Sequence, residues 1–452
     1  MRRRFAALAL FALLFALGWW AGRGRASSDL YARLDIFIEV LQKVRDGYVQ
    51  PVDPQSLIRG AVTGMLRDLD PYAEYLDSRS FDRRDSRAAV RADAGLTLGS
   101  RDGVWMVVAP IALGPGERAG VRPGDALLQV DGHSTGSWTL RETVESLRGA
   151  PGSAVRLSVL HPGDEAPRNF VVTREAPKPA PAPIAIATAD GVGYLRLAGI
   201  DGATSGLVRK ALAALRNRGA RRLALDVRRC ATGTAADGAQ VAELFLPRGT
   251  TLMRTRARSR AADERLEAAA TSPNLEWPLA VLGDGGTAGA AEVLMGALQD
   301  ADRALLVGAR TFGLGSVQTD IPLPGGERVV SLTTAVRETP SGRPIQNLTT
   351  SGSDEGEDDA ATPDSADSGA ARDVFRTASG RRIAGGGGIA PDVEVPSSPS
   401  SGTAALPADT TATGRSRLAA DPAIRRAFQA LQKARAPRDV YAAVPPAGEH
   451  AH

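Results

Sequence analysis

The 452-residue sequence contains one cysteine, four lysines and four histidines. The single thiol excludes an intramolecular disulfide, so cysteine content says nothing about the redox compartment. No histidine lies between residues 186 and 345, which argues against a serine–histidine triad there. Lysine is equally scarce, with Lys210 alone in that stretch. Nucleophilic chemistry in the centre of the chain therefore has few bases available to it.

The sequence also lacks basic runs interleaved with aromatic residues, although its formal net charge is +4. We therefore expect no nucleic-acid binding. Residues 350–371 carry seven acidic residues and no basic one, but their spacing is not that of an EF-hand. Because residues 350–382 are polar and poor in apolar side chains, we predict a disordered acidic insertion there. We expect no metal site and no cofactor.

The first 26 residues read as a signal anchor or signal peptide. Three arginines precede an apolar run over residues 5–22, which is near the minimum length of a membrane span. The positive flank predicts a cytoplasmic N-terminus. A cleaved signal peptide is the alternative, but Gly24 and Ala26 lie beyond the apolar run. We expect an exported protein, anchored in the inner membrane and facing the periplasm, or secreted if the signal is cleaved.

Residues 27–90 have helical spacing of apolar side chains, and Asp53 with Pro54 is typical of a helix start. Residues 91–175 instead predict short strands, two helices and tight turns. The stretch "AGVRPGDALLQVDGHS" (119–134) resembles the signature of a circularly permuted PDZ domain of the bacterial protease type. The resemblance assigns the carboxylate-binding loop to Gly95, Leu96, Thr97 and Leu98, whose backbone N–H groups would hold a peptide terminus. A PDZ fold used only for packing is the alternative.

A Pro/Ala linker (176–185) leads into residues 186–349, where strand and helix patterns alternate. This alternation predicts an α/β layered domain whose sheet is parallel or mixed. Glycine-rich turns at 228–234 and 283–289 follow strand patterns, so we expect both at the carboxyl ends of strands. Residues 383–396 add a short strand to this core. Residues 397–452 read as a linker and a C-terminal helix with Asp421 as its N-cap.

Several motifs resemble the carboxyl-terminal processing peptidases, also called tail-specific proteases. They are "LDPYAEYLD" (69–77), "LALDVRRCATG" (223–233), "GALQDADRALLVGARTFGLGSVQT" (296–319), "TPSGRPIQ" (339–346) and "GGIAPDVEV" (387–395). The resemblance implies a multidomain α/β protein. Its core would be a ClpP/crotonase-like α/β protease domain. The PDZ domain, mostly β with two helices, would be inserted, and the N- and C-terminal segments would be helical.

Members of this family cleave peptides with a serine nucleophile and a lysine general base. In "GDGGTAGAAE" (283–292) the family's nucleophile position falls on Gly289, and in "TFGLGSVQ" (311–318) the base position falls on Leu314. Gln318, which orients the lysine in the family, is retained. The resemblance assigns the oxyanion hole to Ala290 and Gly233. The turn before Gly233 departs from the family pattern, which weakens that half of the oxyanion hole.

Three other groups could replace the missing nucleophile: Thr287, Ser316 and Cys230. We interpret Thr287 as a turn hydroxyl, Ser316 as a loop serine without a base, and Cys230 as a small buried side chain. The favoured hypothesis is an exported, membrane-tethered pseudopeptidase that binds the C-terminal tails of exported proteins through its PDZ domain. The alternatives are an active serine-type endopeptidase or a regulatory subunit of an active paralogue. Terminal helices would pair either with that paralogue or with a second copy of the chain.

Overall fold

The structure is a computed structural model and describes residues 34–76, 92–259, 263–270, 272, 274–325, 328–346, 374–396, 418 and 420–443. The chain divides into two compact units, residues 1–67 and 68–452. The predicted anchor at 5–22, most of the predicted acidic insertion and the linker at 397–417 lie outside the described residues. Within the described ranges, no helix combines the length and apolar character needed to cross a membrane.

The first unit contains a helix over residues 34–47 and helix α2, Pro54–Arg67. The predicted start of α2 is confirmed, because Asp53 Oδ1 accepts a hydrogen bond from the Gln55 amide at 3.1 Å and Pro54 opens the helix. The prediction that helical structure continues to residue 90 is wrong. Strand β1, Glu74–Leu76, lies in the second unit and pairs with strand β16, Val329–Glu338.

Residues 92–175 form a PDZ-like domain with a sheet in the order β2-β3-β4-β6-β7. One of the predicted tight turns is the hairpin between β2 and β3, where Asp102 and Gly103 both have positive φ (51° and 75°). Alternate strand residues point into one apolar core. Strand β2 is the edge strand of the sheet, so the backbone N–H and C=O groups on its outer side have no partner strand. The elements are β2 Leu96–Arg101, β3 Val104–Pro110, α4 Pro115–Ala119, β4 Ala126–Val130, β5 His133–Ser134, α5 Leu140–Leu147, β6 Ala154–Leu160 and β7 Arg168–Thr173.

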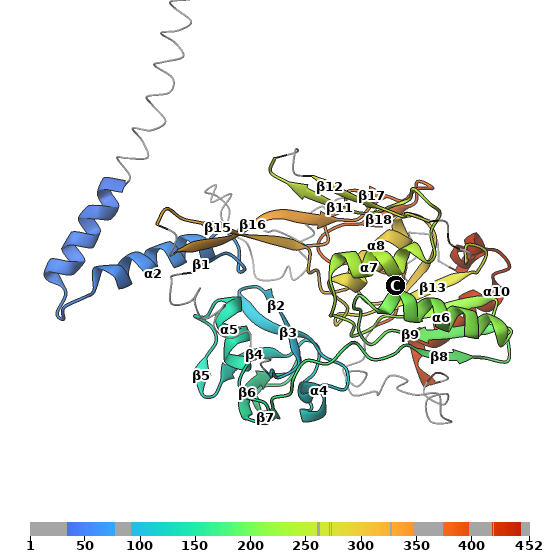
Figure 1. Ribbon diagram of the computed structural model, residues 1–452, viewed down its shortest axis with the longest axis horizontal. Coiled ribbons are helices and arrows are strands. Elements are labelled where there is room, and N and C mark those ends of the chain that lie inside the picture. Colours follow the sequence, from blue (N-terminus) through green and yellow to red (C-terminus); the bar gives the residue numbers. More distant parts are fainter. Residues whose placement is uncertain are drawn as a thin grey trace, which may run out of the picture. The chain divides into compact units, whose positions relative to one another are not determined.

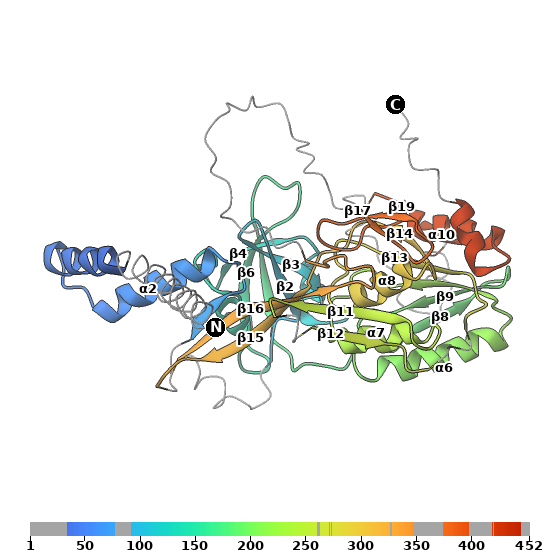
Figure 2. The same ribbon diagram turned by 90° about the horizontal axis from the view of Figure 1, so that it is seen from above.

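The α/β core is built on a six-stranded sheet in the order β19-β14-β13-β10-β9-β8, in which only β8 runs antiparallel to its neighbour. Strand residues point alternately to two apolar clusters, one under helices α6, α7 and α8 and one under helix α10. Figures 1 and 2 show these helices on the two faces of the sheet. The elements are β8 Ile184–Ala187, β9 Val192–Arg196, α6 Thr204–Asn217, β10 Arg222–Asp226, α7 Ala235–Glu243, β13 Leu279–Gly283, α8 Ala290–Asp300, β14 Leu305–Gly308, β19 Val393–Glu394 and α10 Pro422–Lys433.

Two boundaries differ from the predictions. Strand β8 begins at Ile184, inside the predicted linker 176–185, because its isoleucine side chains pack into the apolar cluster beneath helix α10. Strand β17, Val374–Arg376, lies inside the predicted insertion 350–382 and pairs with β18, Arg382–Ala384. The predicted C-terminal helix is confirmed as α10, whose first turn is capped by Asp421 Oδ1 accepting from the Ile424 amide at 3.0 Å.

A second sheet in this unit has the order β1-β16-β11-β12, with β15 also paired to β16. Its strands are half-exposed and polar, so they carry little of the apolar signal that marks a buried strand. Glu74 of β1 also accepts a hydrogen bond from Arg141 of α5, so this strand contacts the PDZ-like domain. The remaining elements are β11 Thr251–Ala257, β12 Glu264–Glu267, β15 Ser316–Pro322 and the 3-10 helix Pro437–Ala443.

Candidate active site

The two glycine-rich turns meet at the carboxyl ends of neighbouring parallel strands, as predicted. Strands β10 and β13 pair in parallel, and the turns at 228–234 and 283–289 follow them. The Ala288 amide donates to the Cys230 carbonyl at 3.0 Å, and the Arg229 amide donates to Asp284 Oδ1 at 3.0 Å. These bonds hold the two turns together as one site.

Gly289 has the backbone conformation φ 57°, ψ −113°, immediately before helix α8. Residues with a side chain rarely adopt this conformation, whereas glycine does so without strain. A β-carbon added at residue 289 would have its nearest neighbour, the Gly233 carbonyl oxygen, at 4.0 Å. The site therefore has room for a side chain at the position predicted for the nucleophile, but glycine supplies none.

The carboxylate of Glu292 connects the nucleophile position to the base position. Its Oε2 accepts hydrogen bonds from the Gly289 amide at 3.0 Å and the Leu314 amide at 2.8 Å. Its Oε1 accepts from the Gly313 amide at 2.7 Å and from the Thr311 hydroxyl. Complete burial raises the pKa of Glu292 to about 7, even though these four donors favour the charged form.

Leu314 is half-buried, and its side chain packs against the apolar cluster of the PDZ-like domain. An alkyl side chain cannot accept a proton, so the base position holds no base. Gln318 is exposed on β15, and its Nε2 donates to Thr333 Oγ1 at 2.6 Å. The structure therefore turns the predicted orienting residue toward β16.

Thr287 has no exposed surface, and its hydroxyl is part of the turn. Its Oγ1 donates to the Val227 carbonyl at 3.0 Å and accepts from the Asp284 amide at 3.0 Å. Ser316 is half-buried on β15, and its amide donates to Gln346 Oε1 at 2.6 Å. Burial raises the pKa of the Cys230 thiol to about 12, so a thiolate is disfavoured. These three geometries match the interpretations made from sequence.

Gly233 and Ala290, the predicted oxyanion residues, lie next to each other. A β-carbon at residue 233, where φ is +95°, would stand 2.5 Å from the Ile200 carbonyl oxygen and 3.2 Å from Ala290 Cβ. Glycine is required at this position for steric reasons. Thr232 Oγ1 accepts from the Ile200 amide at 3.1 Å, so the altered turn is fixed by a side chain of its own.

The predicted carboxylate-binding loop opens strand β2, with Gly95 at φ +67°. The Gly95 amide already donates to Asp93 Oδ1 at 2.7 Å, so this N–H is not available to a peptide. Thr97 Oγ1 donates to the Ala231 carbonyl of the core at 3.4 Å, and Leu98 is buried. The loop is therefore in contact with the glycine-rich turn that forms half of the site.

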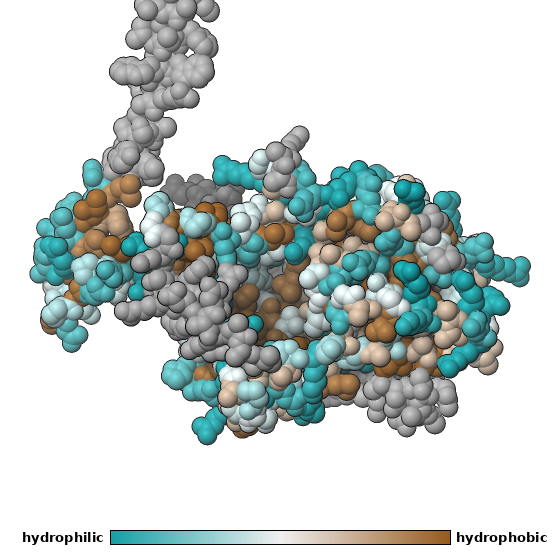
Figure 3. Space-filling model, in the orientation of Figure 1, coloured by the Kyte–Doolittle hydropathy of each residue, from teal (hydrophilic) through white to brown (hydrophobic). Residues whose placement is uncertain are grey.

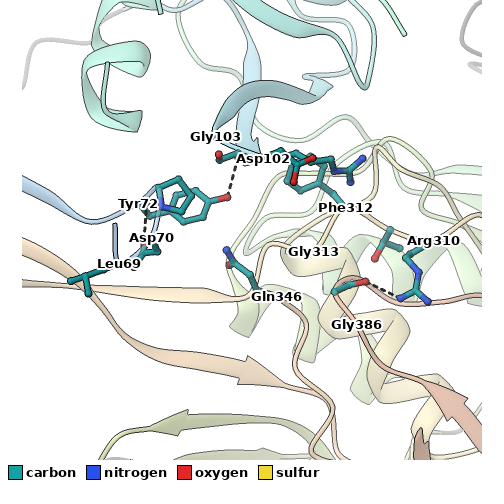
Figure 4. A pocket seen from close by; sticks show the side chains of 15 residues that line it. Leu69, Asp70, Tyr72, Asp102, Gly103, Arg310, Phe312, Gly313, Gln346 and Gly386 are labelled. Carbon is teal, nitrogen blue, oxygen red and sulfur yellow. Dashed lines mark hydrogen bonds between the residues drawn. The ribbon is translucent and has the colours of Figure 1, made fainter. Parts of the chain in front are cut away.

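A pocket of about 470 Å³ lies beside the site (Figure 4). It is lined by residues 69–72, by the β2–β3 turn at 100–103, by the loop at 310–313, by Gln346 and by 386–387. Sequence reasoning missed this pocket because these segments are far apart along the chain. Among the described residues, no group of three or more histidine, cysteine, aspartate or glutamate side chains could hold a metal ion.

Comparison with known proteins identifies three parts of the chain. Residues 191–353 match the model of peptidase family S41, residues 106–160 match a PDZ domain, and residues 23–80 match the N-terminal domain of the activating protease CtpB. The solved structure of a photosystem II D1 C-terminal processing protease aligns with a TM-score of 0.62 and 25% identity, covering 86% of this chain and 97% of that one.

Relatives of known sequence carry the same description. A carboxy-terminal-processing protease of Bartonella bacilliformis is 33% identical over 325 residues, covering 71% of this chain and 74% of its own. The carboxy-terminal processing protease CtpB of Bacillus subtilis is 28% identical over 309 residues, covering 68% of this chain and 64% of its own. With its fold, its PDZ domain and these relatives, the chain belongs to the carboxyl-terminal processing peptidase family.

Proposed function

We propose that this chain is a member of the family that has lost peptidase activity and binds the C-terminal tails of proteins through its PDZ domain. The observation that carries the proposal is the pair Gly289 and Leu314, which meet at the site and supply neither a nucleophile nor a base. Cleavage by the family's chemistry needs both groups. The fold without them retains a scaffold and a binding domain.

The alternative is an active serine-type endopeptidase that has recruited another hydroxyl. Thr287 argues against it because its hydroxyl is fully buried and donates to a backbone carbonyl. Ser316 would need a neighbouring base, but the side chain that bonds its carbonyl, at 3.3 Å, is the guanidinium of Arg337 through Nη1. A guanidinium stays protonated in proteins and cannot serve as a general base.

Restoring the family residues tests whether the loss resides at these two positions. Leu314→Lys would place an amine against the apolar cluster of the PDZ domain, where desolvation favours the neutral form that a base requires. We expect Gly289→Ser combined with Leu314→Lys to gain cleavage of an unstructured protein. The matched control is Gly289→Ala with Leu314→Lys, which should stay inactive. Equal cleavage by the control would contradict the assignment of residue 289.

Tail binding is supported by the position of strand β2 at the edge of its sheet, where no other strand pairs with its outer side and an extended peptide can add. Affinity for a peptide with a free terminal carboxylate should exceed affinity for its amide, because the amides after Gly95 would contact the carboxylate. Isothermal titration of both peptides gives the comparison. Equal affinities would contradict a carboxylate-binding role for residues 95–98.

We further propose that residues 5–22 anchor the protein in the inner membrane and that the body of the chain faces the periplasm. The apolar run preceded by arginines supports this orientation. A protease added to intact spheroplasts should digest the body of the chain, and detergent should be needed to release it. Protection of the body from the protease, or its release by osmotic shock, would contradict the proposal.

The helix over residues 34–47 supports pairing with a second copy or with an active paralogue. It exposes apolar side chains, visible in Figure 3, that a stable monomer would normally bury. These side chains are Leu34, Ile36, Phe37, Ile38 and Val40. Replacing Ile36 and Val40 by serine should reduce the mass measured by light scattering if the helix pairs. An unchanged mass would contradict pairing through this helix.

A further inference from the structure

The edge strand β2 and helix α5 flank the groove in which a PDZ domain of this kind would receive a peptide. Strand β2 ends the sheet, and α5 packs beside it. A peptide that adds to β2 must use the outward N–H and C=O groups of that strand. Any segment of the chain that already bonds to these groups competes with such a peptide.

Residues 72–74 form such a segment. The Ser100 amide of β2 donates to the Tyr72 hydroxyl at 3.1 Å. On the other side of the groove, Arg141 Nε of α5 donates to Glu74 Oε1 at 2.5 Å, and the Glu74 side chain is only 7% exposed. Tyr72 and Glu74 therefore contact both elements that flank the groove.

The Tyr72 ring is buried in the apolar cluster of the PDZ domain, with its centroid 6.4 Å from that of Trp105. Tyr72 and Leu314 are the two residues from outside the PDZ domain that this cluster contains or contacts, among the residues described. An aromatic ring in this position fills space that the side chain of a peptide would otherwise enter. The contact is thus apolar as well as hydrogen-bonded.

The α/β core also contacts strand β2, through the side chain of Phe312. A β-carbon at Gly99 would stand 2.4 Å from the Phe312 ring, so the strand and this ring are in direct contact. The Arg101 guanidinium lies 5.1 Å from the centre of that ring, within the range of a cation–π contact.

We propose that residues Tyr72–Glu74 occupy the upstream end of the PDZ peptide groove in cis, and that a protein tail binds only by displacing them. The proposal rests on the tail-binding function proposed above. It makes residues 72–74, which lead into β1, a built-in competitor of the tail. Tail affinity is then set by the strength of the Tyr72 and Glu74 contacts as well as by the tail itself.

The test compares the full chain with three variants, Tyr72→Phe, Glu74→Gln and Tyr75→Phe. Tyr72→Phe keeps the ring but leaves the Ser100 amide without its acceptor, and Glu74→Gln weakens the bond to Arg141. Tyr75 directly follows Glu74 and is half-exposed, so Tyr75→Phe is the matched control. Hydrogen exchange of the 96–101 amides is measured without peptide, and tail-peptide affinity is measured in parallel.

We expect exchange at Ser100 to accelerate at least fivefold in Tyr72→Phe, and tail affinity to rise at least threefold in Tyr72→Phe and Glu74→Gln. Tyr75→Phe should change neither quantity. Unchanged exchange at Ser100 in Tyr72→Phe would overturn the cis contact. Faster exchange with unchanged or weaker tail binding would overturn the competition. Failure of every variant and the parent to bind any tail would reject the proposed tail-binding function, while exchange would still report the cis contact.

Discussion

The amides of Gly289 and Leu314 donate to the same oxygen atom, Oε2 of Glu292, at 3.0 and 2.8 Å. The positions predicted for the nucleophile and the base are thus joined through one buried carboxylate, although Gly289 supplies no nucleophile and Leu314 no base. The geometry of the site is kept by backbone hydrogen bonds, which do not depend on the side chains at 289 and 314. The fold around the site therefore does not require a serine at 289 or a lysine at 314.

Glu292 predicts a pH dependence of stability. Burial raises its folded-state pKa to about 7, above the ordinary value of 4.5. The folded protein therefore binds this proton more tightly than the unfolded chain. The contribution is full below pH 4.5 and is lost as the pH rises through about 7, by about 3 kcal/mol. Urea unfolding of the parent and of Glu292→Gln, between pH 4.5 and 8, should show this slope in the parent only.

If the free energy of unfolding had the same pH dependence in the parent and in Glu292→Gln, the titrating group would be a residue other than Glu292. The comparison of slopes is the readout because Glu292→Gln also turns an NH₂ group toward backbone donors and lowers stability at every pH. A constant loss of stability is therefore compatible with the prediction, whereas an equal pH dependence is not.

Gly289 predicts an unusual sensitivity to a single methyl group. Gly289→Ala should lower the free energy of unfolding by about 1–3 kcal/mol, because alanine is strained at φ 57°, ψ −113° even though no atom lies within 4.0 Å of the added carbon. Gly285→Ala in the same turn is the control, since Gly285 has no positive φ and no atom within 4 Å of its β-carbon position. Equal effects of the two substitutions on urea unfolding would refute the strain.

Thr287 is expected to act through structure. Thr287→Val removes the hydroxyl that bonds Val227 and Asp284 and should cost about 1–3 kcal/mol, because the Asp284 amide loses its acceptor and the Val227 carbonyl keeps only its bond from the Cys230 amide. Thr287→Ser keeps the hydroxyl and should cost less than half as much. Thermal unfolding of the two variants measures the difference. A larger loss in Thr287→Ser would show that the methyl group, and not the hydroxyl, carries the contribution.

Cys230 should be unreactive while the protein is folded. Its thiol is fully buried and its pKa is raised to about 12, so the reactive thiolate is scarce at pH 8. A thiol reagent such as dithionitrobenzoate should label the protein only after denaturation with guanidinium. Rapid labelling of the native protein, matching that of the denatured chain, would reopen Cys230 as a nucleophile.

The sequence predicted that both glycine-rich turns lie at the carboxyl ends of strands. Because the carboxyl ends of adjacent parallel strands lie at one edge of a sheet, two such turns can come into contact. The Ala288–Cys230 hydrogen bond confirms that prediction. The burial of Glu292 could not be predicted, since it depends on the loop at 311–314 folding over helix α8 from beyond strand β14. In the sequence, Glu292 is one acidic residue in the first turn of a helix.

The contacts of Tyr72 and Glu74 could not be predicted from the sequence either. Their partners, Ser100 and Arg141, are 28 and 67 residues away. Strand β1 is only three residues long and pairs with β16, whose half-buried pattern alternates weakly. Short polar strands of this kind are stabilised by tertiary pairing, and local sequence patterns do not reveal which strands pair.

A direct cleavage assay tests the proposed absence of peptidase activity. The chain from residue 28 onward is incubated with an unstructured protein that ends in apolar residues, and products are followed by mass spectrometry. We predict no fragments above those formed without the chain. Fragments that disappear in Ser316→Ala or in Thr287→Val, with each variant still folded by circular dichroism, would contradict the account.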